Sequence, residues 1–272
     1  GCGQAGTGDS CRTGENPGDG QASGVIGDSG EKTVTEGVLF RVIQAEDGAA
    51  PLLLAKADGG PGDVCTLSPV TVEPTLDGES TAAMDLVYTP GTLLEVTCGS
   101  VLETYPGRLA EVTAVNIRSD GFDDRCALYL RVLNDLWAVD EGLNSDAAEI
   151  SVDLSGTSLS ESEQAAVAWA FGGEHGISGI LTLDYEELAA EGYITGTDPD
   201  SGGMPCWENG CLFTVTEQET GDNGLNGARN TVTFDAQKWR SALGAYFFAD
   251  CTAEQAPDGH WGDYAVGSEA IS

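Results

Sequence analysis

The sequence predicts two domains: a small all-β barrel, followed by an α+β domain with an antiparallel sheet and about three helices. Strand-type alternation is concentrated between residues 34 and 118, and helical spacing begins near Phe122. Successive side chains of a strand leave opposite faces, so a period of two indicates half-buried strands. A length of 272 residues is compatible with two domains of ordinary size. We therefore expect domains at residues 34–118 and 119–272, preceded by a tether.

Residues 1–33 are rich in Gly, Ser, Asp and Glu and nearly free of large apolar side chains. Such a composition cannot bury enough surface to fold and is typical of a flexible linker. Cys2 follows the small residue Gly1. In bacterial lipoproteins, the cysteine that carries the lipid also follows a small residue. Cys2 is therefore the predicted lipidation site. The alternative is an ordinary exposed cysteine, or a disulfide with Cys11.

The stretch Leu93–Ile117 carries the clearest strand pattern of residues 34–118. It predicts three short strands, with a turn at Gly99-Ser100 and an end or sheet edge at Pro106, which cannot donate to a ladder. Thr81–Leu86 fits either a short helix or a turn. Five strands with tight connections and one short insert predict an OB-like barrel.

The segments Glu103–Pro106 (ETYP) and Val115–Ile117 (VNI), with Glu36–Val42 (EGVLFRV) upstream, resemble the YobA-like domains. These are small OB-like domains of unknown function in extracytoplasmic lipoproteins of Firmicutes. The resemblance covers residues 34–118, under a third of the chain. It implies an OB-like fold and a cell-surface location, and it brings no catalytic residue. The chain departs from the pattern in the Gly- and Pro-rich insertion Gly59–Gly62 and in carrying Cys65 and Cys98.

Acidic residues far outnumber basic ones. The chain has 45 Asp and Glu against 11 Lys and Arg, a formal charge of −34. Binding to phosphates of nucleic acids, or to anionic lipid head groups, needs clustered Lys and Arg, so both classes are excluded. The acidity predicts a hydrated, self-repelling surface, or alternatively a cation or basic partner. No continuous apolar run of about 18 residues exists. Contact with a membrane is therefore expected only through a lipid on Cys2.

Eight cysteines without a metal motif indicate an oxidising, extracytoplasmic setting. Cys206 and Cys211 enclose a compact loop with the turn signal Asn209-Gly210, and a disulfide there would contribute roughly 2 kcal/mol. Cys65 and Cys98 are a second candidate pair, across the barrel. The spacing does not determine the connectivity.

In residues 119–272, helical spacing from Phe122 predicts a first helix. The sequences Ser160–Glu163 and Asp184–Glu187 match the capping box and predict the starts of two more. Gly172-Gly173 is expected to end the second helix. Four further segments alternate as strands: Glu149–Leu154, Ile180–Leu183, Leu212–Glu219 and Asn230–Asp235.

The run Lys238–Cys251 fits either a helix or a strand. Its aromatic enrichment and the turn Pro257–Gly259 after it favour a strand from about Ala242. That strand would pair with His260–Val266, completing an antiparallel sheet of about five strands.

Two groups of residues suggest ligand contacts. Asp198, Asp200 and Gly202 resemble part of a calcium loop, but the twelfth position is Asn209 rather than Glu, so the segment is no EF-hand. We expect no cofactor, with calcium as the alternative. Lys238 and Arg240 are basic residues in a strongly acidic region. They fit either local charge pairing or an anion contact.

Catalytic signatures are missing from the sequence: it has no P-loop, nucleophile elbow or metal-binding helix motif. His175 and His260 are interpreted as structural. We expect an extracytoplasmic, surface-anchored lipoprotein that binds a protein, peptide or saccharide partner without catalysis. The alternatives are a hydrolase whose paired carboxylates meet only in the fold, and a calcium-stabilised acidic module.

Overall fold

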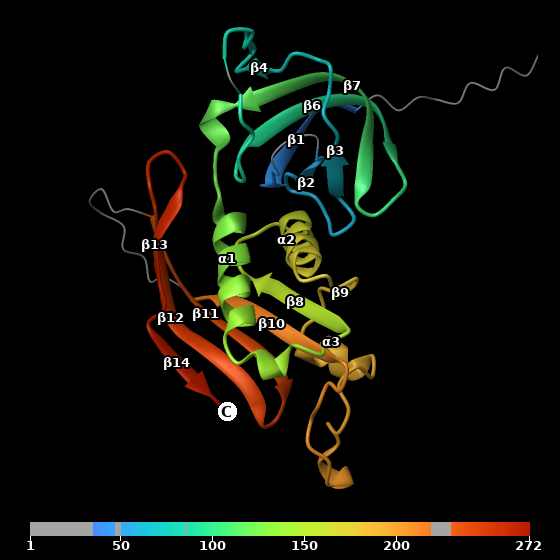
Figure 1. Ribbon diagram of the computed structural model, residues 1–272, viewed down its shortest axis with the longest axis vertical. Helices are drawn as coiled ribbons and strands as arrows, with labels where there is room; N and C mark the ends of the chain where they lie inside the picture. Colours follow the sequence, from blue (N-terminus) through green and yellow to red (C-terminus); the bar gives the residue numbers. More distant parts are fainter. Residues whose placement is uncertain (1–34, 47–49, 85, 219–229) are drawn as a thin grey trace, which may run out of the picture. The chain divides into compact units, whose positions relative to one another are not determined.

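The computed structural model describes residues 35–46, 50–84, 86–218 and 230–272. This part of the chain is mostly β, with two seven-stranded sheets and three α-helices (Figure 1). The predicted tether, with Cys2 and Cys11, lies outside the described residues.

The first sheet forms a closed five-stranded barrel, as the alternation predicts. Its strands are β1 (Thr35–Gln44), β2 (Leu52–Lys56), β3 (Val64–Leu67), β6 (Leu93–Leu102) and β7 (Gly107–Arg118), with the small hairpin β4 (Thr75–Leu76) and β5 (Glu79–Ser80) beside β7. The barrel order is β3-β2-β1-β6-β7, and β3 closes it by pairing with β7 in parallel. Because β3 and β7 pair with each other, neither of these outer strands leaves an unpaired edge along the paired residues. The barrel core is built around Phe40, Leu54 and Leu94.

The predicted turn at Gly99-Ser100 is wrong, because β6 continues through it to Leu102. A Cβ at Gly99 would lie 2.5 Å from the Glu111 carboxylate, so the glycine lets that side chain cross the strand. A register shift at Thr97 and Cys98 adds curvature. The helical alternative for Thr81–Leu86 is also wrong, since the Met84 N–H donates to the Thr81 carbonyl in a turn.

The second sheet has the order β13-β12-β11-β10-β8-β9, and β14 pairs with β12. Its strands are β8 (Glu149–Gly156), β9 (Gly179–Leu181), β10 (Gly210–Glu217), β11 (Asn230–Ser241), β12 (Gly244–Gln255), β13 (Trp261–Ala265) and β14 (Ser268–Ile271). The expected antiparallel sheet is in fact mixed, because β8 is parallel to both β9 and β10. Helical connections return the chain to the same end of the sheet, which parallel pairing requires.

The run Lys238–Cys251 is extended, but it is divided between two strands. β11 continues to Ser241, and β12 begins at Gly244 after a tight turn. The expected strand start at Ala242 therefore falls in the turn. The predicted turn Pro257–Gly259 does separate β12 from β13.

The three α-helices are α1 (Arg125–Ala138), α2 (Glu161–Glu174) and α3 (Tyr185–Ala190), with short 3-10 helices η1 (Ser119–Gly121), η2 (Glu141–Leu143) and η3 (Pro199–Ser201). Both predicted capping boxes are confirmed. The Glu163 N–H donates to Ser160 Oγ at 3.3 Å, and the Glu187 N–H donates to Asp184 Oδ1 at 2.8 Å. Each cap satisfies a backbone donor that the helix leaves unpaired.

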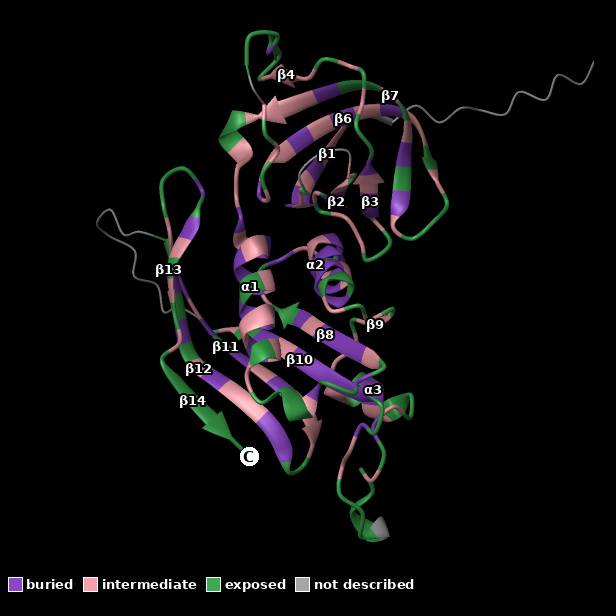
Figure 2. Cartoon of the chain, in the orientation of Figure 1, coloured by how far each residue is buried: buried purple, intermediate pink, exposed green. Residues whose placement is uncertain are grey.

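Helix α2 is buried on most of its surface and joins the two sheets (Figure 2). It packs against β8 and also against β1, β2 and β3 of the barrel. The Ser162 N–H donates to the Gly59 carbonyl at 3.1 Å. Barrel residues such as Ile43 and Leu53 share one core with Phe171. Residues of both sheets therefore contribute to a common core around α2.

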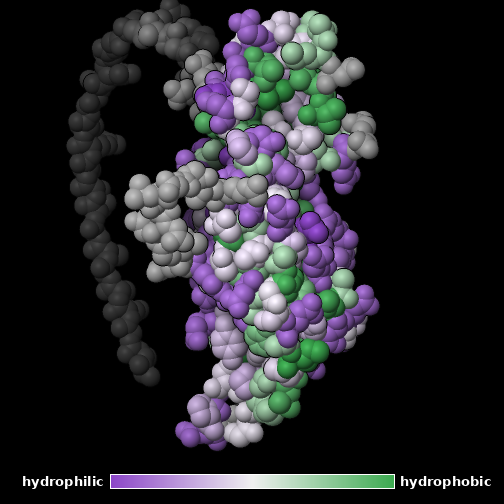
Figure 3. All heavy atoms as spheres, turned by 90° about the vertical axis from the view of Figure 1, so that its left-hand side faces the viewer, coloured by the Kyte–Doolittle hydropathy of each residue, from purple (hydrophilic) through white to green (hydrophobic). Residues whose placement is uncertain are grey.

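Among the described helices, none has both the length and the apolarity needed to cross a bilayer. The face of the molecule in Figure 3 is mostly polar, with apolar side chains in small groups.

Candidate functional site

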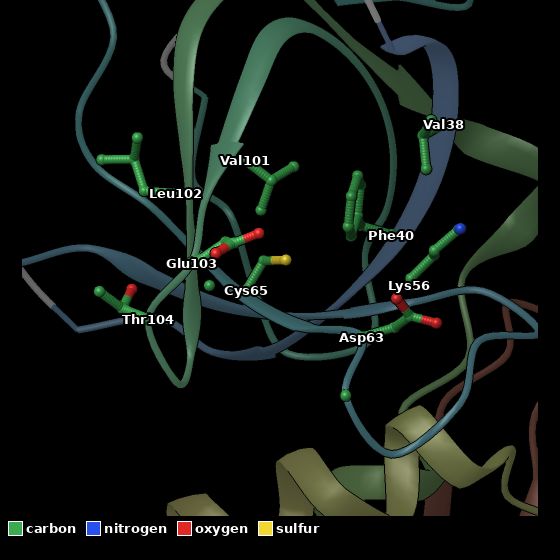
Figure 4. A pocket seen from close by; sticks show the side chains of 11 residues that line it. Val38, Phe40, Lys56, Asp63, Cys65, Val101, Leu102, Glu103 and Thr104 are labelled. Carbon is green, nitrogen blue, oxygen red and sulfur yellow. The ribbon is translucent and has the colours of Figure 1, made fainter. Parts of the chain in front are cut away.

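A pocket of about 310 Å³ opens on the barrel between β1, the loop before β3 and the β6–β7 turn (Figure 4). Val38 and Phe40 of β1 line it, and so do Val101 and Leu102 at the end of β6. These strands hold the apolar side chains in place because β1 and β6 are paired in the sheet. The volume is at the lower end of the range for small-molecule sites.

Four polar side chains complete the pocket: Lys56, Asp63, Glu103 and Thr104. In Figure 4 the Glu103 carboxylate points into the space beside Phe40, while Lys56 and Asp63 lie on the side nearer to a helix. An apolar wall with a few polar groups is the usual composition of a binding site.

Two short loops position these polar groups. In the first, the Asp63 carboxylate accepts the Gly60 N–H at 2.9 Å, and the Lys56 N–H donates to the Asp63 carbonyl at 3.0 Å. In the second, the Thr104 hydroxyl donates to the Pro106 carbonyl at 2.8 Å, and its N–H donates to the Leu102 carbonyl at 2.8 Å. The loop backbones are therefore held by internal hydrogen bonds.

The Cys65 thiol lies at the pocket floor with 6% of the residue exposed. Burial raises its pKa to about 11, and the nearby Asp63 carboxylate adds to the effect. A thiol with this pKa is protonated at neutral pH, and the thiolate is the reactive form. Cys65 is thus an apolar lining group rather than a nucleophile.

No protein-family model, curated protein or solved structure matches this chain. The resemblance to YobA-like domains therefore stays an expectation.

No disulfide joins the described cysteines. The expected Cys206–Cys211 ring is not closed: Cys211 is a buried residue of β10, and Cys206 bridges Thr195 and Ser241 through its backbone. Burial raises the pKa of Cys211 to about 12. Cys65 and Cys98 do share the barrel core, but no disulfide joins them.

Lys238 and Arg240 are engaged within the protein. The fully buried Lys238 donates to the carbonyls of Val139 and Asp140 and to the Asn144 side chain. Arg240 forms an ion pair with Asp146 and donates to the carbonyls of Leu143 and Glu208. The ammonium has used its three donors, so local pairing replaces the anion contact as the role of Lys238.

The two histidines have structural partners. His175 stacks on Trp137 with ring centroids 4.0 Å apart, and its Nε2 lies 2.7 Å from Asn134 Oδ1. His260 Nδ1 contacts the nearly buried Asp124 carboxylate, whose other oxygen accepts the Trp261 N–H at 2.6 Å. Asp124 therefore fixes the β12–β13 hairpin to the segment before α1. The sequence did not reveal this pairing.

The suggested calcium loop is a local turn, in which Asp198 Oδ1 accepts the Asp200 N–H at 2.9 Å. Within the described ranges, no group of three or more His, Cys, Asp or Glu side chains is arranged to hold a metal ion.

The sequence alone does not predict the barrel pocket, although both of its loops stand out in the sequence. Gly59–Gly62 is a Gly- and Pro-rich segment, and Glu103–Pro106 holds a proline that ends a predicted strand. The two segments are far apart in the sequence, and the parallel pairing of Cys65 with Gly107 brings them together.

Proposed function

We propose that this chain is a non-enzymatic binding module whose barrel pocket takes a small group with an apolar body and a positive charge. The observation that carries the proposal is the Glu103 carboxylate pointing into a pocket walled by Phe40 and Val101 (Figure 4). Asp63 adds a second carboxylate against the single ammonium of Lys56. A cation with an apolar body therefore complements this pocket better than an anion does.

Binding fits the pocket better than catalysis because its potential nucleophiles are not activated. Cys65 has a raised pKa, and the Thr104 hydroxyl donates to a backbone carbonyl rather than to a base. Nucleophilic catalysis needs a lowered pKa or an adjacent general base. Neither the Thr104 hydroxyl nor the Cys65 thiol meets either condition.

The strand order supports the OB-like expectation. In OB-like barrels, ligands bind at the loop joining the last two strands, among other places. The corresponding connection here is Glu103–Pro106, between β6 and β7. The group bound can be a free amine or a basic side chain of a peptide, which share the same chemistry.

Isothermal titration calorimetry with three probes of similar size tests this proposal. Benzylamine should bind and release heat in a saturable manner, while phenylacetate and benzyl alcohol should bind at least tenfold more weakly. The Glu103→Gln variant should lose the preference for the amine. Glu79→Gln, at an exposed position of β5, is the matched control and should behave like the parent protein. Equal binding of the three probes, or an unaffected Glu103→Gln variant, would refute the proposal.

The extracytoplasmic, lipid-anchored location is part of the proposal and is supported by sequence composition alone. Metabolic labelling with an alkyne fatty acid in a bacterial host tests it, on a precursor that carries a lipoprotein signal peptide. Label that depends on Cys2, and that Cys11→Ser retains, would support the anchor. Unlabelled protein in the soluble fraction would count against it.

A further inference from the structure

A second hollow, of about 360 Å³, borders the same two loops of the barrel and helix α2. Pro61 and Tyr105 line it from the barrel, Trp169 lines it from α2, and residues 180–183 line it along and just beyond β9. We call this hollow the Trp169 groove. It is distinct from the barrel pocket, since the two share no lining residue.

Two aromatic side chains form one wall of the Trp169 groove. The Tyr105 and Trp169 rings meet edge to face, with centroids 5.4 Å apart and planes at 87°. The Tyr105 hydroxyl donates to the Pro61 carbonyl at 3.4 Å, yet half of the residue stays exposed. Ala165 and Ala168, on the same face of α2 as Trp169, leave the groove open because they carry only a methyl group. The wall thus offers a fixed apolar surface to a partner.

The groove is also lined by β9, a strand at the edge of the second sheet. β9 is the last strand in the sheet order, and among the described strands it pairs only with β8. The outward backbone N–H and C=O groups of such an edge form a template for an added strand. Ile180 and Leu181 belong both to this edge and to the groove lining. A chain lying in the groove can therefore pair with β9 while contacting Trp169.

The charge of the groove indicates which kind of chain fits. Among the residues that the structure describes, Glu191 is the one charged side chain that lines it, and the whole protein carries a formal charge of −34. We propose that the Trp169 groove binds an extended peptide segment that carries basic and apolar side chains, through strand addition to β9. Three residues at roughly 3.3 Å each give a paired length of about 10 Å. A saccharide would stack on the rings but would leave the β9 edge unpaired.

Fluorescence anisotropy with a labelled octapeptide of alternating valine and lysine tests this inference. The peptide should bind in a saturable manner, and Trp169→Ala should weaken binding at least tenfold. Tyr105→Ala is a second variant, at a half-exposed position, and should weaken it severalfold. Leu243→Ala, at an exposed apolar residue between β11 and β12, is the control and should change nothing. Circular dichroism verifies that each variant is folded.

Backbone pairing is tested by methylating alternate amide nitrogens of the peptide, which removes the N–H groups that β9 would accept. The methylated peptide should not bind measurably. Equal binding of both peptides, or no saturable binding, would overturn the inference, as would Trp169-dependent binding of a labelled cellohexaose in place of the peptide. Saturating benzylamine, the probe for the barrel pocket, should not displace the peptide from the Trp169 groove, so failure here and failure at the barrel pocket are distinguishable.

Discussion

The buried Lys238 ammonium donates a 2.5 Å hydrogen bond to Asn144 Oδ1 and thereby ties β11 to the segment that follows α1. The same nitrogen donates to the Asp140 carbonyl at 3.1 Å and to the Val139 carbonyl. Burial lowers the pKa of Lys238, since desolvation disfavours the charged form. The hydrogen bonds to three acceptors offset part of that cost.

Lys238→Met should lower the free energy of unfolding by about 3 kcal/mol, because it leaves the buried Asn144 Oδ1 and two part-buried backbone carbonyls without this donor. Urea denaturation followed by circular dichroism measures the change. Lys56→Met, at an exposed lysine, is the control and should change stability by less than about 0.5 kcal/mol. Similar stability of both variants would show that the acceptors find other donors.

Gly210→Ala should be strongly destabilising. A Cβ at Gly210 would lie 2.0 Å from the Trp207 ring, which is almost fully buried. Overpacking of this kind costs about 1–3 kcal/mol or prevents folding. Gly173→Ala is the matched control, since a Cβ there meets no described atom within 4 Å, and it should stabilise helix α2 by about 0.5–1 kcal/mol. In thermal melting, Gly210→Ala should have the lowest melting temperature, the parent protein an intermediate one and Gly173→Ala the highest.

His175 should make stability depend on pH. Burial lowers its pKa below the usual value of 6.5. The unfolded chain therefore binds a proton more readily than the folded one, and the contribution of His175, present above pH 6.5, is lost as pH falls through the lowered pKa. Denaturant midpoints at pH 7.5 and 5.5 should differ less in His175→Gln than in the parent protein. If the two midpoints differ by the same amount in both proteins, His175 is not the source of the pH dependence.

Alkylation should distinguish the cysteines of the folded protein. Burial raises the pKa of Cys65 and of Cys251 to about 11 and that of Cys211 to about 12, so their thiolate populations are very small at pH 8. Iodoacetamide at pH 8 should modify the partly exposed Cys206 before these three, as read by peptide mapping. In urea all four should react at similar rates. Rapid native labelling of Cys65 would mean that the barrel pocket opens readily.

Local features of the sequence predicted local structure correctly. The capping boxes at Ser160 and Asp184 place the starts of α2 and α3, because their hydrogen bonds join residues three apart. Alternation likewise predicts most strands, since it reflects neighbouring side chains. The turn signal Gly99-Ser100 misleads, because the strand continues through it and the glycine makes room for the Glu111 side chain.

The sequence by itself determined the acidity, the strand and helix periods and the small barrel. Only the tertiary structure decided that β8 pairs in parallel with both β9 and β10. It also decided that Lys238 is buried and that two hollows form beside the barrel loops. The physical reason is the range of the interactions. Periodicity and caps depend on residues within a turn or two, whereas the Tyr105–Trp169 contact joins distant segments that only the packing of α2 against the barrel brings together.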